Sequence, residues 1–149
     1  MELDVRIKLL VYRQFAETAE APSVSFVAAN VAVAPDDVRA SYERLFRSRV
    51  LVLEPDGETI RMAPPFSGVP TQHHVRVHDR PQQRYYANCA WDALGIPAAL
   101  HLPATIRSRC EQSREPLELE VTEDGPVPSS WLFHCAVPAA NWWQDIVYT

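Results

Sequence analysis

The sequence predicts an α+β protein whose first part is helical and whose second part is mainly β. Three segments in the first 50 residues place apolar side chains at helical spacing, which is typical of amphipathic helices. From residue 73 onward, several short segments alternate apolar and polar residues, which is typical of strands. A chain of 149 residues is long enough for one domain or for two small lobes.

Residues 3–18 predict the first helix, because apolar side chains recur there every three or four residues. The members of this stripe are Leu3, Ile7, Leu10, Val11 and Phe15. Pro22 interrupts the pattern, and the segment SFVAANVAV then predicts a short second helix. Ser25 is the expected N-cap of that helix, since a serine side chain can accept a bond from a backbone N–H group of the first turn.

A third helix is expected to start at Pro35. Proline fits the first turn of a helix, and the carboxylates of Asp36 and Asp37 favour its positive end. The expected apolar face of this helix consists of Val38, Tyr42, Leu45 and Phe46.

The segment RVLVLEPDGETIRM predicts two short strands around a Pro-Asp-Gly turn, because glycine accepts the backbone angles of such a turn. Three helices followed by a hairpin is the order of a winged helix, so residues 1–66 predict a winged-helix-like lobe. Such lobes often bind DNA, but residues 1–66 hold 8 basic and 10 acidic side chains. A weak basic face is expected on or after the third helix, from Arg39, Arg44, Arg47 and Arg49.

The proline-rich segment APPFSGVPTQ is interpreted as the linker between the lobes. Residues 67–149 then predict a small mixed or antiparallel β-sheet lobe with short helices. Its expected strands are HHVRVH, TIRSRC, LELEV and SWLFHCAV. The segment CAWDALGIPAAL predicts a short helix that Gly95 and Pro97 close.

Composition limits the partners and the compartment. The formal net charge is −5, so nucleic acid is an unlikely partner and no attraction to anionic membranes is expected. No apolar run has the length of a membrane span, and the N-terminal MELDVRIKLL lacks a signal-peptide pattern. Three cysteines is an odd number, which favours reduced thiols. These features predict a cytoplasmic protein.

Cys89 and Asp92 are the first candidates for chemistry. If CAWDAL is helical, positions 89 and 92 share a face, so the thiol and the carboxyl group can reach one small ligand. A thiolate binds soft metals, and a carboxyl group beside it can move a proton. Cys-x-x-Asp alone is a weak signal, however, and free cysteines are often buried. A buried, inert Cys89 therefore stays open as an alternative.

The other cysteines and the histidines carry weaker signals. Cys110 at the end of TIRSRC and Cys135 within SWLFHCAV fit the pattern of packed thiols. His73, His74 and His78 suggest a metal site, but no CxxC or HExxH spacing accompanies them. The sequence also has no glycine-rich phosphate loop. Neither a structural zinc site nor a nucleotide site is expected.

The run YYANCAWDALGIPAAL, a strand ending in Cys110 and the following EPLELEV together resemble the organomercurial lyases, also called alkylmercury lyases. That family has a Tyr-Ala-x-Cys-Ala-x-Asp-x-Leu segment, a further cysteine about two dozen residues later and then a short strand. It also carries a winged-helix-like N-terminal lobe. The resemblance covers most of the chain, and residues 86–110 are its most specific part.

The resemblance implies protonolysis of a carbon–mercury bond. Cys89 would be the first thiolate to bind the mercury of the substrate, and Asp92 would also lie at the metal and relay a proton to the leaving carbon. Cys110 matches a family cysteine with a structural role. No cofactor is implied, since cytosolic thiols would take away the ionic mercury. The implied partner is a small organomercurial or another thiophilic ligand.

The resemblance also implies a second catalytic cysteine, which alignment by the Val-Pro step of SWLFHCAVPAANWWQDIVYT places at or just after Thr149. We therefore expect the chain to be truncated before that residue. Three interpretations stay open: binding through Cys89 without turnover, a partner chain that supplies the cysteine, or a native protein that extends past Thr149. In the last case, selenocysteine at an in-frame stop codon is one hypothesis.

Two alternatives accompany the lyase hypothesis. The first is a winged-helix DNA-binding protein or a thiol-based sensor, and the second is a protein in which Cys89 is inert. The segment AANWWQDIVYT is apolar, so it is expected to pack on the sheet or to form a homo-oligomer contact.

Overall fold

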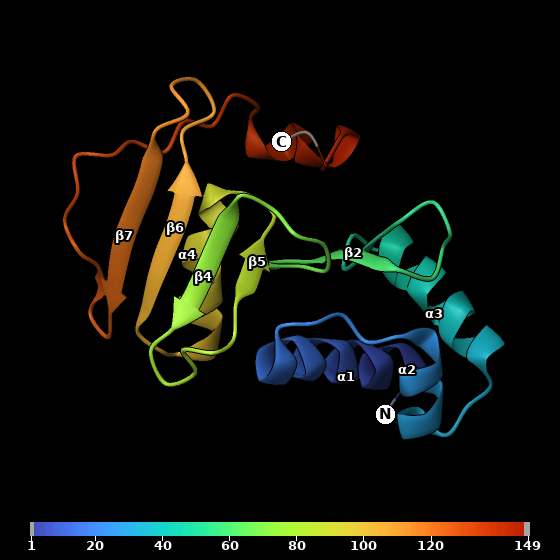
Figure 1. Cartoon of the computed structure of the whole chain (residues 1–149). Helices are drawn as coiled ribbons and strands as arrows, with labels where there is room; N and C mark the ends of the chain where they lie inside the picture. Colours follow the sequence, from blue (N-terminus) through green and yellow to red (C-terminus); the bar gives the residue numbers. More distant parts are fainter. Residues whose placement is uncertain (1, 148–149) are drawn as a thin grey trace. The chain divides into compact units, whose positions relative to one another are not determined.

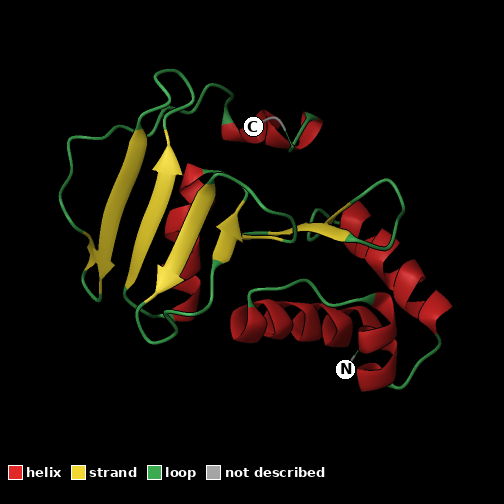
Figure 2. Cartoon of the chain, viewed as in Figure 1, coloured by secondary structure: helices red, strands yellow, loops and turns green. Residues whose placement is uncertain are grey.

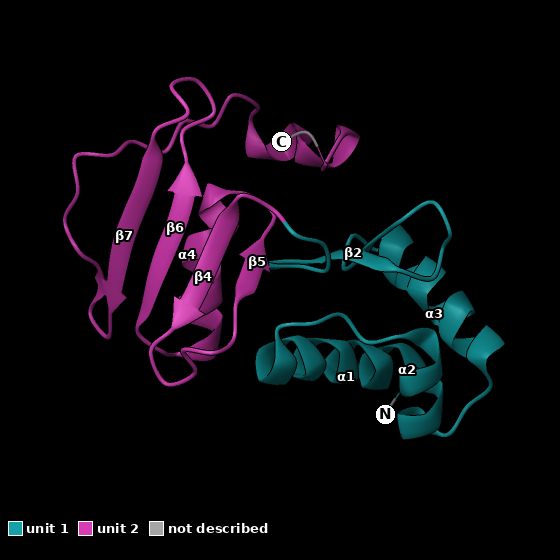
Figure 3. Ribbon diagram, in the orientation of Figure 1, with its two compact units in different colours: residues 1–70 teal, residues 71–149 magenta. Residues whose placement is uncertain are grey.

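The structure is a computed structural model that describes residues 2–147 of the chain. The chain forms two compact units, Met1–Pro70 and Thr71–Thr149 (Figure 3). The boundary between them lies within the segment predicted as a linker. In the part of the chain that is described, no helix is long and apolar enough to cross a membrane.

The first unit contains the three predicted helices: α1 (Leu3–Thr18), α2 (Val24–Val31) and α3 (Pro35–Arg47) (Figures 1 and 2). The prediction of Ser25 as the cap of α2 is wrong. Ser23 is the N-cap, and its hydroxyl accepts a hydrogen bond of 3.2 Å from the backbone N–H of Phe26. The apolar pattern could not separate two serines that stand two positions apart.

Helix α3 begins as predicted at Pro35, and the Asp37 carboxylate accepts a 3.2 Å hydrogen bond from the backbone N–H of Ala34. Its predicted face is buried at Val38, Tyr42 and Leu45, but the prediction for Phe46 is wrong, since this side chain is 44% exposed. Three buried positions already complete the stripe that faces the core. Phe46 therefore lies at its edge.

The predicted hairpin is confirmed. Strands β1 (Val52–Leu53) and β2 (Ile60–Ala63) pair antiparallel, and Gly57 adopts a φ of +70° in the turn between them. The predicted linker is partly wrong, because β3 (Phe66–Ser67) pairs with β2. The ring of Phe66 stacks on Phe15 of α1 with a centroid distance of 5.4 Å, which ties this strand to the helices.

Gly68 follows β3 at a position with no room for a side chain. A Cβ atom there would lie 1.9 Å from the carbonyl oxygen of Ile60, so replacing Gly68 by alanine must displace the backbone. We expect Gly68→Ala to lower the free energy of unfolding by about 1–3 kcal/mol, measured by chemical denaturation. Gly57→Asn is the matched control, because its Cβ meets nothing within 4 Å and asparagine tolerates positive φ. Equal unfolding midpoints for both variants would contradict the expectation.

The second unit is built on antiparallel strand pairs in the order β5-β4-β6-β7-β8. Three of the four strands predicted for this lobe are confirmed, as HHVRVH, TIRSRC and LELEV lie in β4, β6 and β7. The strands are β4 (His73–Val77), β5 (Tyr85–Ala87), β6 (Ala104–Arg109), β7 (Pro116–Thr122) and β8 (Gly125–Pro126).

Helix α4 (Ala90–Leu100) packs on one face of this sheet, against β4, β5 and β6 (Figure 1). Val75 and Val77 of β4 are fully buried, whereas Arg76 between them is exposed, so the other face of β4 is polar. The predicted closure of the helix at Gly95 and Pro97 is wrong. The helix continues past both residues to His101, which has a φ of 54°.

The segment SWLFHCAV forms no strand, so that prediction is wrong. Leu132 is 92% exposed, and the following segment contains only a 3-10 helix, η1 (Ala139–Gln144). An alternating pattern indicates an extended backbone but provides no strand for it to pair with. The position predicted for a second catalytic cysteine, at or after Thr149, lies outside the described residues.

Candidate functional site

The start of α4 brings Cys89 and Asp92 together. Strand β5 ends at Ala87, and Cys89 is the N-cap of α4, with an extended backbone (φ −146°, ψ 178°). The Cys89 carbonyl accepts the first helical hydrogen bond, 3.0 Å from the backbone N–H of Ala93, and Asp92 lies in the first turn. The Cys89 thiol and the Asp92 carboxyl group are close enough for each to shift the pKa of the other. The expected proximity of these two groups is therefore present.

Burial raises the pKa of the Cys89 thiol above its ordinary value. The backbone N–H groups of Asp92 and Trp91 at the helix start act in the opposite direction, because they stabilise a thiolate. The negative charge of Asp92 and its hydrogen bond with the thiol add to the increase. The net effect is a thiol that keeps its proton in the absence of a ligand.

Burial likewise raises the pKa of the Asp92 carboxyl group. Hydrogen bonds from Asn88 and from the Cys89 thiol oppose this effect, since they stabilise the carboxylate. The Asn88 Nδ2 atom donates to Asp92 Oδ2 over 3.1 Å. The sequence analysis did not identify Asn88, although its position four residues before Asp92 was an available signal.

This geometry provides a soft ligand beside a proton carrier. A thiolate binds soft cations, and a half-buried carboxyl group with a raised pKa can hold a proton and transfer it. Within residues 2–147, no group of three or more histidine, cysteine or acidic side chains is arranged to hold a metal ion.

The other two cysteines lie elsewhere in the second unit. Cys110 follows β6 in a turn, where its sulfur accepts a hydrogen bond of 3.5 Å from the backbone N–H of Ser113. Hydrogen bonds from Ser113, first from its side chain, lower the pKa of Cys110. Cys135 is exposed and its thiol donates to the Val137 carbonyl over 2.8 Å, so the prediction of a packed Cys135 is wrong.

The segment that carries Cys135 reaches the start of α4. The rings of Trp91 and Phe133 lie 5.8 Å apart, centroid to centroid, at an angle of 45°. Both rings remain about half exposed, at 56% and 47%. An apolar contact therefore stands beside the thiol–carboxyl pair, from a segment that the sequence analysis assigned to a strand.

The three candidate histidines form hydrogen bonds within the second unit. The Nδ1 atom of His73 lies 2.7 Å from the hydroxyl of Ser108, and His74 Nε2 lies 2.8 Å from the carbonyl oxygen of Thr71. His78 is bonded to other residues at the opposite end of β4. Burial lowers the pKa of His73. These bonds give each ring a structural partner.

The two-unit α+β fold and the half-buried thiol beside a carboxyl group at a helix start define the class of protein. The chain belongs to the alkylmercury lyase family, because the model of that family matches residues 66–149, more than half of the chain. Among curated proteins, no significant match was found.

A solved structure has a similar fold. It is the crystal structure of the mercury-bound form of MerB2, with a TM-score of 0.67 and 22% sequence identity. The match covers 87% of this chain and 61% of that one, so the chain spans about three fifths of the length of this relative.

Proposed function

We propose that the protein cleaves the carbon–mercury bond of organomercurials by protonolysis at Cys89 and Asp92. The observation that carries the proposal is the position of the Cys89 thiol beside the Asp92 carboxyl group, at the start of α4 within the region that matches the family. Mercury is part of the substrate here, and no resident cofactor is proposed.

The first step is capture of the substrate. The mercury of R–Hg–X bonds to the Cys89 sulfur, X leaves as an anion, and the thiol proton passes to the Asp92 carboxylate. The closeness of the thiol and the carboxylate supplies the route for this proton. The raised pKa of Asp92 favours the protonated acid that results.

The second step breaks the bond to carbon. Asp92 transfers its proton to the carbon, the electron pair of the carbon–mercury bond becomes the new carbon–hydrogen bond, and R–H leaves. Hg(II) remains on the Cys89 sulfur, and the Asp92 carboxylate is restored. Small cytosolic thiols are the proposed acceptors of this ion, because sulfur ligands bind a soft cation strongly. The cytoplasm, where such thiols are reduced, is the compartment that we propose.

The DNA-binding alternative is not favoured, because three of the four arginines expected to form a basic face, Arg39, Arg44 and Arg47, have acidic partners. Arg39 pairs with Asp36 and Glu58, each over 2.7 Å. Arg44 forms two hydrogen bonds with the Asp4 carboxylate, of 2.8 and 2.6 Å. These bonds leave little free positive charge on α3 for phosphate groups. The apolar segment AANWWQDIVYT, in which Val147 is 51% exposed, remains a proposed homo-oligomer contact.

A direct test is the release of a hydrocarbon. With an arylmercury salt as the substrate and excess small thiol as the acceptor, we expect catalytic formation of the arene, measured by headspace gas chromatography. In D2O the arene should carry one deuterium atom, because the proton that reaches carbon comes from an exchangeable group. Binding of the mercurial without any arene would refute the lyase function and leave a binding function.

A further inference from the structure

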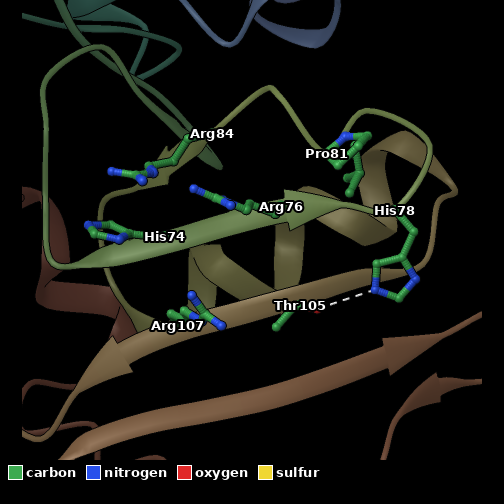
Figure 4. A pocket seen from close by; sticks show the side chains of 8 residues that line it. His74, Arg76, His78, Pro81, Arg84, Thr105 and Arg107 are labelled. Carbon is green, nitrogen blue, oxygen red and sulfur yellow. Dashed lines mark hydrogen bonds between the residues drawn. The ribbon is translucent and has the colours of Figure 1, made fainter.

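The polar face of the second unit holds an open pocket (Figure 4). Its volume is about 340 Å³, which is in the range of sites for small molecules. The pocket lies over β4 and β6, on the face of β4 that carries the exposed Arg76 side chain. It is lined by His74, Arg76, Val77, His78, Pro81, Arg84, Thr105 and Arg107.

Two arginines, Arg76 and Arg84, lie next to each other in the lining of this pocket (Figure 4). Val75 pairs with Tyr85 in the antiparallel ladder, so the register places Arg84 opposite Arg76. Figure 4 shows both guanidinium groups on the same side of the strand, extending in the same direction. Like charges directly opposite in a sheet destabilise it. An anion between the two groups would remove this repulsion.

Arg76 and Arg84 lack the acidic partners that other arginines of the described chain have. Among the residues that the structure describes, neither Arg76 nor Arg84 forms an ion pair with a carboxylate. The arginines with acidic partners are Arg39, Arg44, Arg47, Arg61, Arg107 and Arg114. Because the net charge of the protein is −5, the unpaired charges are a local feature and not part of a basic surface.

We propose that this pocket binds a small molecule through an oxyanion group, a phosphate or a carboxylate. Arg76 and Arg84 would bind the oxyanion, since planar guanidinium groups match two of its oxygens at once. The ring of His74 lies at the same end of the pocket (Figure 4) and is a polar part of its lining. The site is separate from the proposed chemistry at Cys89.

The neighbouring strand favours a small anion over a nucleic acid. Arg107 pairs with Glu118 of β7 over 2.7 Å, and the Thr105 hydroxyl donates to Glu120 over 2.8 Å. Two carboxylates therefore border the pocket on the β7 side. An extended phosphate backbone that crossed this face would meet their negative charge, whereas a small anion fits between Arg76 and Arg84.

The test is a titration of the full chain with inorganic phosphate at constant ionic strength, monitored by NMR of the backbone amides. We expect saturable shifts confined to β4, β6 and the residues around Arg84. Arg76→Gln combined with Arg84→Gln should weaken phosphate binding by about tenfold to a hundredfold, because the double variant lacks both cationic hydrogen-bond donors of the site. Arg39→Gln combined with Arg114→Gln removes the same charge outside the pocket and should leave phosphate affinity unchanged.

The outcomes separate the possibilities. Shifts that do not saturate, or equal affinity in both double variants, would overturn the proposal. Duplex DNA that competes with phosphate through Arg76 and Arg84 would overturn the preference for a small ligand. A parallel titration with citrate distinguishes the source of the oxyanion, since the tighter of the two probes identifies phosphate or carboxylate. Cys89→Ser should bind phosphate normally, so failure of the lyase proposal leaves this test intact.

Discussion

Cys89→Ser should reduce the affinity for an organomercurial by about a thousandfold, because it removes a thiolate ligand of a soft metal and thiolate–metal bonds contribute several kcal/mol each. The hydroxyl of serine is a hard and weakly acidic ligand, so it cannot replace the sulfur. Cys89 is only half-buried at the helix start, and its side chain caps no backbone group. Serine is itself a good N-cap, so the substitution should leave the fold stable.

The experiment requires a background without competing thiols. Cys135 is exposed and Cys110 has a lowered pKa, so either can bind a mercurial without any catalytic role. The reference protein is therefore Cys110→Ser combined with Cys135→Ser, which should still bind one mercurial per chain in the presence of a competing small thiol. Adding Cys89→Ser should abolish this binding, as measured by calorimetry and by the intact mass of the adduct. If the reference protein fails to bind while Cys89→Ser alone binds, the mercurial site lies elsewhere.

The sequence predicted the first unit well, because each of its elements has a local signal. Helix α3 shows this most clearly, since Pro35 and two carboxylates define its start and Val38, Tyr42 and Leu45 define its buried face. The failure at Ser25 involved a choice between two nearby serines of equal propensity. The failure at Phe66 had another cause, because its strand depends on pairing with β2 and on stacking with Phe15.

The second unit was harder to predict where its structure depends on tertiary contacts. Helix α4 passes through Gly95 and Pro97, two residues that normally end helices, and Pro97 is buried. Packing of the helix on the sheet outweighs these local preferences. The segment around Cys135 shows the reverse, since a regular alternating pattern found no strand to pair with.

The site was predictable in part. Spacing and helix geometry indicated that Cys89 and Asp92 lie together, and the structure places both at the start of α4, where each shifts the pKa of the other. Spacing could not indicate that both groups are half-buried, nor that Asn88 binds the carboxyl group. It also gave no sign of the pocket at Arg76 and Arg84, because that pocket depends on the register between two strands. The catalytic roles remain predictions.

Asp92→Asn should lower the rate of hydrocarbon release by about a hundredfold to ten-thousandfold, the usual contribution of a general acid. Asparagine keeps the size of the side chain but cannot carry the proton from the thiol to the carbon. Asp124→Asn is the matched control, because Asp124 is an exposed carboxylate in the turn before β8. It should release arene at the normal rate.

The same variant should make the Cys89 thiol more reactive, although it slows the release of hydrocarbon. Burial raises the pKa of Cys89, and the charge of Asp92 and its hydrogen bond with the thiol raise it further. Removing the charge lowers this pKa, so more of the thiol is ionised at neutral pH. In the Cys110→Ser, Cys135→Ser background, a neutral thiol reagent should therefore label Cys89 faster when Asp92→Asn is added. A general loss of structure would lower the melting temperature as well. Loss of the proton donor alone should slow turnover, speed labelling and leave the melting temperature near its normal value. Slower labelling together with normal turnover would show that Asp92 neither contacts the thiol nor supplies the proton.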